Sequence, residues 1–236
     1  MCSAAAAAAA AALLPGFAEV VVVRHGETSW NASKTIQGQL DAELNEKGRQ
    51  QANAVGVKLS KERKFSAIYA SDLQRAAETA NIIASSCNLP KVVVLDPALR
   101  ERHLGDLQGL TLDKAAKQKP AAHKIFLSSR RDQELPGGGE SLDQLSKRCV
   151  SCLQKIAGQH KGERVIVVTH GGVLRELYRR ANPGAPRGGT IHNTSVNVFH
   201  ISDPGDPWII KNWGDVSHLK DTGVLKSGFG GDGTSG

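Results

Sequence analysis

Aromatic residues are scarce in this sequence: they make up 4% of its 236 residues. Single-stranded nucleic acids are commonly held on stacked aromatic side chains, so this scarcity argues against such a platform. The formal net charge is +7, but no block of Lys and Arg and no zinc-finger spacing accompanies it. The charge fits a small anionic ligand such as a phosphate ester, or simply a solvated basic surface. We expect no nucleic-acid partner.

Long apolar runs are also missing, since none approaches the roughly 20 residues that a helix needs to cross a bilayer. We therefore expect no membrane partner. The N-terminus, Met1-Cys2-Ser3 followed by alanines 4–12, has neither the basic residues of a secretory signal nor the Arg of a transit peptide. We predict a disordered Ala-rich extension over residues 1–17 and a cytoplasmic protein, with organellar targeting left open. The Gly/Ser-rich residues 221–236 are predicted to form a flexible tail.

Cysteine is limited to four residues, of which Cys149 and Cys152 form a lone CxxC. Such a pair can serve redox chemistry or supply half of a zinc site. Here both thiols share helical spacing with Leu145, Leu153 and Ile156. We therefore favour a buried apolar helix face, in which free cysteines pack as small hydrophobic side chains.

Apolar strands alternate with amphipathic helices along residues 18–220, which we interpret as one domain. This alternation predicts βαβ units and a three-layer α/β/α fold, with a mainly parallel central sheet and an antiparallel edge strand. Ser71 is expected to cap the helix over residues 72–87, whose apolar stripe is the clearest. The expected strands are 20–23, 67–70, 91–95, 165–169, 194–201 and 208–213; the expected helices are 46–60, 72–87, 141–160 and 172–180, with a weakly helical stretch over 110–131.

Three of these strands end in chemically suggestive residues, namely Arg24-His25-Gly26, Ser71-Asp72 and Thr169-His170-Gly171-Gly172. Open parallel sheets bind ligands at the carboxyl ends of their strands. If the three strands are parallel neighbours, their ends converge on one pocket. This placement makes a catalytic site the first hypothesis.

The residue types suit phosphoryl transfer. An imidazole such as that of His25, held through one ring nitrogen, can present the other as a nucleophile. His170 precedes two glycines at a helix start, where backbone amides bind anions. Arg75 offers a guanidinium fork for phosphate oxygens, and the Glu101 carboxyl could act first as acid and then as base. Each residue taken singly also has a plain structural interpretation, as a strand-end histidine or a surface charge.

Several motifs together resemble the histidine phosphatase superfamily, the phosphoglycerate-mutase-like fold, over about residues 20–219. Gly139-Glu140-Ser141 resembles the phosphatase branch of this superfamily, and the chain as a whole is similar to plant phosphoglycerate-mutase-like proteins. One departure is Asp41-Ala42-Glu43-Leu44, where many members carry a proline before the leucine. The resemblance is carried by residues 24–31, Gln37-Gly38, residues 71–76, Thr79-Ala80, Leu99-Arg100-Glu101 and residues 169–172.

The resemblance implies a role for each matching residue. His25 would accept the phosphoryl group, and Glu101 would protonate the leaving alcohol and then activate water. The phosphoryl oxygens would be held by Arg24, Arg75 and His170. No metal and no cofactor is implied. The remaining residues expected to contact the substrate are Asn31, Gln37, Gly38, Arg102 and Gly171.

The implied activity is metal-independent hydrolysis of small-molecule phosphomonoesters through a phosphohistidine, with phosphoserine as the first substrate to consider. A cofactor-dependent phosphoglycerate mutase is the alternative, although the segment 105–139 is shorter than expected for one. A non-catalytic phosphate-binding protein is a more distant alternative, and a homodimer through an edge strand is left open. Basic residues that could recognise a second acidic group, or could merely be solvated, are Lys34, Arg100, Arg102, Arg130 and Arg131.

Overall fold

The structure is a computed structural model that describes residues 16–89, 92–186, 188–204 and 206–220. Nearly all of the predicted N-terminal extension and the whole predicted C-terminal tail lie outside the described residues. Within the described ranges, no helix is long and apolar enough to cross a membrane.

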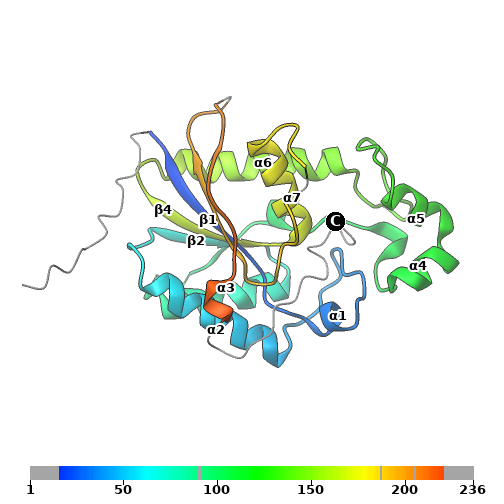
Figure 1. Ribbon diagram of the computed structural model, residues 1–236, viewed down its shortest axis with the longest axis horizontal. Helices are drawn as coiled ribbons and strands as arrows, with labels where there is room; N and C mark the ends of the chain where they lie inside the picture. The colour runs from blue at the N-terminus through cyan, green and yellow to red at the C-terminus, as the bar shows by residue number, and fades with distance from the viewer. Residues whose placement is uncertain (1–15, 90–91, 187, 205, 221–236) are drawn as a thin grey trace, which may run out of the picture.

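The centre of the domain is a six-stranded sheet of order β3-β2-β4-β1-β5-β6 (Figure 1). Strands β1 to β4 pair in parallel, whereas β5 runs antiparallel to both β1 and β6. The prediction of a mainly parallel sheet with an antiparallel edge is therefore confirmed. The strands are β1 (Ala18–Arg24), β2 (Ala67–Ala70), β3 (Val94–Leu95), β4 (Arg164–Thr169), β5 (Val196–Ile201) and β6 (Ile209–Asp215).

Alternating residues of the central strands build two cores. Val20 and Val22 of β1 pack with α6 (Leu142–Gln159) and α7 (Gly171–Ala181), whereas Val21 and Val23 pack with α2 (Glu46–Ser60) and α3 (Gln74–Ser86). Because successive strand residues point to opposite faces, an unbroken apolar strand needs a helical layer on each side. Figure 1 shows these layers above and below the sheet, as the three-layer prediction requires.

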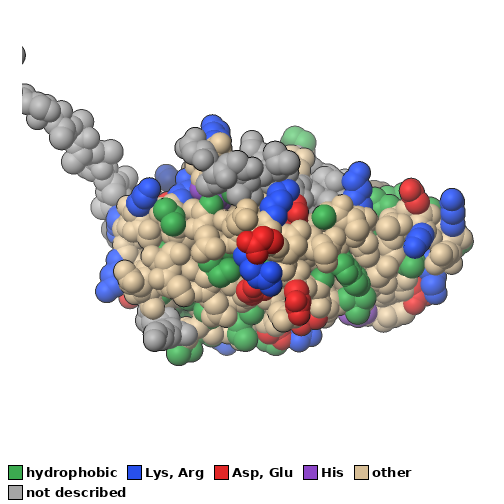
Figure 2. All heavy atoms as spheres, turned by 90° about the horizontal axis from the view of Figure 1, so that it is seen from below, with side chains coloured by type: hydrophobic (Ala, Val, Ile, Leu, Met, Phe, Trp, Pro, Cys, Tyr) green, Lys and Arg blue, Asp and Glu red, His purple; other side chains and the backbone are tan. Residues whose placement is uncertain are grey.

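Figure 2 views the molecule from below Figure 1, the side on which α2 and α3 lie. Acidic and basic side chains are interspersed on it. Arg49 and Glu78, for example, link α2 to α3 with their Nε and Oε1 atoms 2.7 Å apart. The net positive charge is thus not gathered into a single basic stripe on this face, and the absence of a nucleic-acid partner stays a prediction.

A third, smaller core lies beside the carboxyl ends of the strands and includes Ile36, Leu104 and Leu107. It is covered by α4 (Leu112–Gln118) and α5 (Pro120–Phe126). The weakly helical stretch predicted over 110–131 is thus two short helices, because Pro120 has no N–H to continue the first one. A further short helix, α1 (Ser29–Ala32), and the 3-10 turns η1 (Pro97–Leu99), η2 (Gly105–Leu107) and η3 (Ser217–Leu219) complete the described elements.

The predicted start and cap of the helix after β2 are wrong. Helix α3 begins at Gln74, and the Ser71 hydroxyl accepts a hydrogen bond from the Leu73 amide at 3.3 Å instead of capping the helix. The Gln74 amide donates to Asp41 Oδ1 at 2.7 Å. A carboxylate brought by a distant loop therefore serves the helix N-terminus, where negative charge is stabilising. Of the expected strand 91–95, residue 91 lies outside the described residues, residues 92 and 93 form no strand, and Val94 and Leu95 pair with β2.

Candidate active site

The ends of β1 and β4 bring two histidines together. The strands are parallel neighbours with Arg24 opposite Thr169, and the His25 amide donates to the Thr169 carbonyl at 2.9 Å. The next residue of each strand end, His25 and His170, carries a buried imidazole, and the ring centroids lie 5.1 Å apart. The predicted convergence of these two strand ends is therefore observed.

The His25 ring is held through one nitrogen. Nδ1 lies 2.7 Å from the Gly26 carbonyl oxygen, which can only accept, so Nδ1 carries the proton and Nε2 keeps its lone pair. Burial, together with the charges of Arg75 and Arg24, holds the His25 pKa well below its usual value. The ring is consequently neutral at physiological pH, which is the form that can act as a nucleophile.

Main-chain contacts fix the turn that carries this histidine. The Asn193 side chain donates to the His25 carbonyl at 3.0 Å, and the Gly26 amide donates to Thr79 Oγ1 at 3.0 Å. Thr194, in the left-handed region with φ of 55°, donates its amide to the Arg24 carbonyl at 3.0 Å. Three hydrogen bonds from other elements therefore hold the turn that carries His25.

Two buried arginines supply positive charge. Arg75 donates to the Gly38 carbonyl at 2.7 Å and the Leu40 carbonyl at 2.9 Å, and Arg24 donates to the Ile191 carbonyl at 2.6 Å. Neutral carbonyls orient these guanidiniums without neutralising them. Burial lowers the Arg75 pKa to about 10, partly offset by Glu101 and Asp41, so Arg75 remains charged at neutral pH.

His170 occupies the N-cap position of α7, immediately before Gly171 and Gly172. Neither of its buried ring nitrogens has a hydrogen-bond partner within the described part of the chain. Burial and the nearby Arg75 lower its pKa well below the usual value. A buried imidazole without such a partner is costly unless a ligand satisfies it, and the amides of a helix start favour an anion at this place.

Glu101 approaches the same helix start from the loop after β3. Its Oε2 accepts from the Gly172 amide at 3.0 Å, and its Oε1 accepts from the Arg102 amide at 2.8 Å. Burial raises the Glu101 pKa, against these amides and the charges of Arg75 and Arg24. The carboxyl can therefore hold a proton at a higher pH than an exposed one, as a general acid requires.

The remaining predicted residues, Asn31, Gln37 and Gly38, lie in the segment after β1. Asn31 Oδ1 accepts from the Thr28 amide at 3.0 Å, and Gln37 Oε1 accepts from the Thr28 hydroxyl at 3.0 Å. Gly38 has φ of 52°, and an added Cβ would lie 2.2 Å from Gln108 Oε1. The left-handed conformation favours glycine where the carbonyl of residue 38 reaches Arg75, and a larger residue would also displace the Gln108 side chain.

The basic residues expected to meet a second acidic group separate into two kinds. Arg100 pairs with Asp72 at 2.5 Å, Arg130 with Asp132 at 2.8 Å, and Arg131 with both Glu176 and Asp143 at 2.5 and 3.0 Å. Lys34 is exposed. Arg102 differs, because it is buried next to Glu101 and donates through Nε to the Glu140 carbonyl at 2.9 Å.

A family model described as histidine phosphatase superfamily (branch 1) matches residues 20–216. The chain belongs to the histidine phosphatase superfamily. Phosphoglycerate mutase-like protein 4 of Arabidopsis thaliana is 61% identical over 220 residues, covering 93% of this chain and 95% of that protein. The metal-independent phosphoserine phosphatase of Arabidopsis thaliana is 52% identical over 214 residues, covering 91% and 88%.

A solved structure has a similar fold. It is described as phosphoserine phosphatase from Entamoeba histolytica in complex with 3-phosphoglyceric acid. It superposes with a TM-score of 0.73 at 27% identity, over 86% of this chain and 99% of that one. The predicted resemblance to the superfamily is confirmed.

Sequence reasoning missed the residues that hold the histidine phosphatase site from behind. Asn193 was not predicted, and Thr79 stood in a motif without a role. No local pattern identifies either residue, because each acts through a main-chain atom from another element.

The lone CxxC is buried as expected: burial raises the pKa of Cys149 and of Cys152 to about 12, so both remain thiols.

Proposed function

We propose that this chain is a phosphatase that hydrolyses small phosphomonoesters without a metal ion, through a phosphohistidine at His25. The observation that carries the proposal is the neutral His25 ring, held through Nδ1, next to His170 and within the influence of the buried Arg75 and Arg24 charges. Positive charge and donors arranged in advance around a transferred phosphoryl group are the main source of catalysis in such reactions.

In the first half-reaction, His25 Nε2 attacks phosphorus. A bond from Nε2 to phosphorus forms while the bond from phosphorus to the ester oxygen breaks. Glu101 gives its proton to that oxygen, so an alcohol departs instead of an alkoxide. Arg24, Arg75 and His170 stabilise the charge on the phosphoryl oxygens.

The second half-reaction reverses the proton movement. Glu101, now a carboxylate, takes a proton from water as the water oxygen bonds to phosphorus. The bond from phosphorus to Nε2 breaks, which releases inorganic phosphate and returns both residues to their starting forms. Division into two steps replaces one difficult displacement with two easier ones.

The substrate that we propose first is phosphoserine. The support comes from the relatives, one named a phosphoserine phosphatase, and from Arg102. Arg102 is the one buried arginine among the five basic residues considered for a second acidic group, and it follows Glu101 directly. A carboxylate on the alcohol portion of the ester would meet this guanidinium on the leaving-group side.

A phosphoglycerate mutase is the second candidate, because another relative carries a mutase-like name. A mutase must shield its phosphohistidine from water until the phosphoryl group is transferred to a second hydroxyl of the substrate. In this chain the segment 105–139 carries only two seven-residue α-helices, α4 and α5, within the described residues. A segment this short supports hydrolysis over a mutase reaction.

One set of assays separates these functions. The purified protein would be given a panel of phosphomonoesters that includes phosphoserine, and phosphate release would be followed. Interconversion of the two monophosphoglycerate isomers would be measured alongside, with bisphosphoglycerate present. We expect release without interconversion. Interconversion that depends on bisphosphoglycerate would establish the mutase, and vanadate binding without turnover would establish the binding protein.

A homodimer would use the β3 edge of the sheet. Val94 and Leu95 are 44% and 51% exposed there, and nearby Val92 is 74% exposed. An exposed apolar edge strand invites pairing with a second copy. Sedimentation of wild type and of Leu95→Lys checks this: we expect a dimer that the lysine disrupts, and a wild-type monomer would contradict it.

A further inference from the structure

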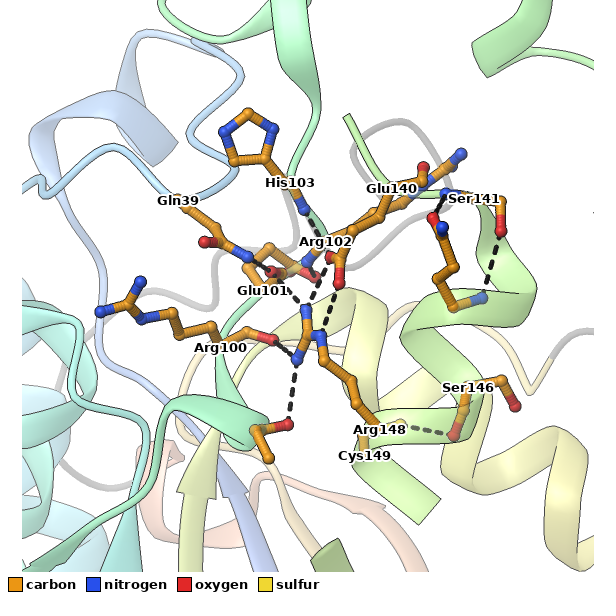
Figure 3. A network of polar contacts seen from close by, with 12 residues as sticks. Gln39, Arg100, Glu101, Arg102, His103, Glu140, Ser141, Ser146, Arg148 and Cys149 are labelled. Atoms are coloured by element: carbon orange, nitrogen blue, oxygen red, sulfur yellow. Dashed lines mark hydrogen bonds and ion pairs between the residues drawn. The ribbon is translucent and has the colours of Figure 1, made fainter. Parts of the chain in front are cut away.

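The guanidinium of Arg148, in α6, uses all five of its N–H groups (Figure 3). Nε and Nη2 donate to the two carboxylate oxygens of Glu140 at 2.7 and 2.8 Å. Nη1 donates to the carbonyls of Ala98 and Arg100 at 2.9 and 2.6 Å, and Nη2 donates to the Glu101 carbonyl at 2.8 Å. One side chain thus holds three carbonyls of the segment that delivers Glu101.

Glu140 hydrogen-bonds the next residues of the same segment, Arg102 and His103. Its Oε2 accepts from the His103 amide at 2.8 Å, its amide donates to the His103 carbonyl at 2.8 Å, and its carbonyl accepts from Arg102 Nε at 2.9 Å. Hydrogen bonds to Arg148 and His103 keep the Glu140 pKa below its usual value despite burial. The ion pair therefore persists at neutral pH.

The segment has little regular structure of its own. It follows the 3-10 turn η1 and runs without a helix or strand from Arg100 to Leu104. An irregular loop cannot fix a carboxyl to the fraction of an ångström that proton transfer demands unless other residues support it. The support comes from α6, a rigid helix of 18 residues that begins at the Ser141 capping box.

Building on the proposed function, we infer that Arg148, locked by Glu140, is a positioning residue that sets the reach of the Glu101 carboxyl for proton donation to the leaving oxygen. Arg148 hydrogen-bonds the backbone of the acid-bearing segment, whereas the Glu101 carboxyl itself is held by the amides of Arg102 and Gly172. We call the Arg148–Glu140 pair and its hydrogen bonds to these carbonyls the clamp. Without the clamp, the backbone of residues 98–101 would be free to move, and the Glu101 carboxyl would no longer reach the ester oxygen.

A positioning role predicts a dependence on the leaving group. An alkyl ester such as phosphoserine needs a proton on its departing oxygen, whereas para-nitrophenyl phosphate has a good leaving group. In Arg148→Lys we expect kcat/KM to fall about 100-fold for alkyl esters but less than about fivefold for the aryl ester, since general acids contribute at this scale. kcat/KM is the correct readout, because it reports the step in which the ester bond breaks.

Two further variants sharpen the test. Glu140→Gln should give the same selective loss, and Arg148→Lys with Glu140→Gln should cost little more than either change alone, because both break one clamp. Lys147→Ala is the matched control, since this neighbouring residue of α6 is exposed. It should behave as wild type with every ester. Thermal unfolding confirms that each variant is folded. If Arg148→Lys is unfolded, Glu140→Gln alone provides the test.

Three outcomes decide the inference. A selective loss with alkyl esters supports it. An equal loss with alkyl and aryl esters, or no loss, overturns it, because a merely structural residue would not sense the leaving group. If wild type releases no phosphate from any ester, or if His25→Ala is as active as wild type, the proposed function fails instead.

Discussion

The imidazole rings of His25 and His170 lie with their centroids 5.1 Å apart and their planes inclined by 56°. The two residues come from the ends of neighbouring parallel strands, and both rings are buried. Burial and the adjacent arginine charges lower the pKa of both rings, so both are neutral at physiological pH. One neutral ring can then attack phosphorus while the other donates a hydrogen bond to a phosphoryl oxygen.

Replacement of each histidine should therefore have a different effect. We expect His25→Ala to release no detectable phosphate and to form no acid-labile phosphoprotein. His170→Ala retains the nucleophile but loses a donor, so its kcat should fall about 100- to 1,000-fold, the usual cost of one such group. Rapid-quench labelling with radioactive substrate measures both the phosphoprotein and the released phosphate.

The control for these variants is His123→Ala, since His123 lies in α5, outside the cluster of buried site residues. Its rate should match wild type. Phosphoprotein formation in His25→Ala at the wild-type level would overturn the assignment of the nucleophile.

The pH dependence of kcat/KM should report Glu101 and His25. Burial raises the Glu101 pKa, so the fraction that can donate a proton falls as the pH rises through that value, and alkyl ester hydrolysis should decline with it. Protonation of His25 should reduce activity only well below pH 6.5, the usual value, because its pKa is lowered. A profile measured with phosphoserine between mildly acidic and alkaline pH checks both limbs.

Glu101→Gln separates the ionisation of Glu101 from that of the substrate phosphate, whose own second pKa is about 6. The variant should lose the alkaline decline due to Glu101 while the contribution from the substrate persists. An unchanged alkaline limb in Glu101→Gln would assign that limb to another group.

Gly26 should resist substitution because the backbone of α2 lies against it. A Cβ on this residue would be 2.5 Å from the Gly48 carbonyl oxygen and 3.1 Å from the Gly48 Cα. The backbone segments at residue 26 and at residue 48 cannot move apart without displacing the turn that holds His25. We expect Gly26→Ala to lower the free energy of unfolding by about 1–3 kcal/mol, as overpacking does, measured by urea denaturation.

The matched control is Gly158→Ala in α6, where an added Cβ would meet nothing within 4 Å. This change should raise the free energy of unfolding by up to about 1 kcal/mol, because alanine favours a helix over glycine. Equal effects of the two substitutions would show that the contact with Gly48 does not limit residue 26.

Removal of metal ions should leave the reaction unchanged. The proposed charge stabilisation comes from Arg24, Arg75 and His170, and the proton from Glu101, so no step needs a divalent cation. Phosphate release after dialysis against EDTA should equal that of untreated enzyme. Loss of activity that added magnesium, manganese or zinc restores would contradict the mechanism.

Local patterns in the sequence determined the elements and their order. The unbroken valines of β1 required a strand buried on both faces, and the stripe over α3 required an amphipathic helix. These signals are local because periodicity decides which side chains can be buried together. They also placed His25 and His170 at strand ends, and the rule for parallel sheets brought those ends together.

Only the tertiary structure decided how the site is held. Asp41 serves the start of α3, Asn193 holds the His25 carbonyl, and Arg148 holds the segment that carries Glu101. Each contact joins a side chain to a main-chain atom far along the sequence, and backbone atoms are the same for every residue. The sequence by itself therefore pointed to the groups that we propose carry the chemistry, whereas the packed fold decided which residues hold them in place.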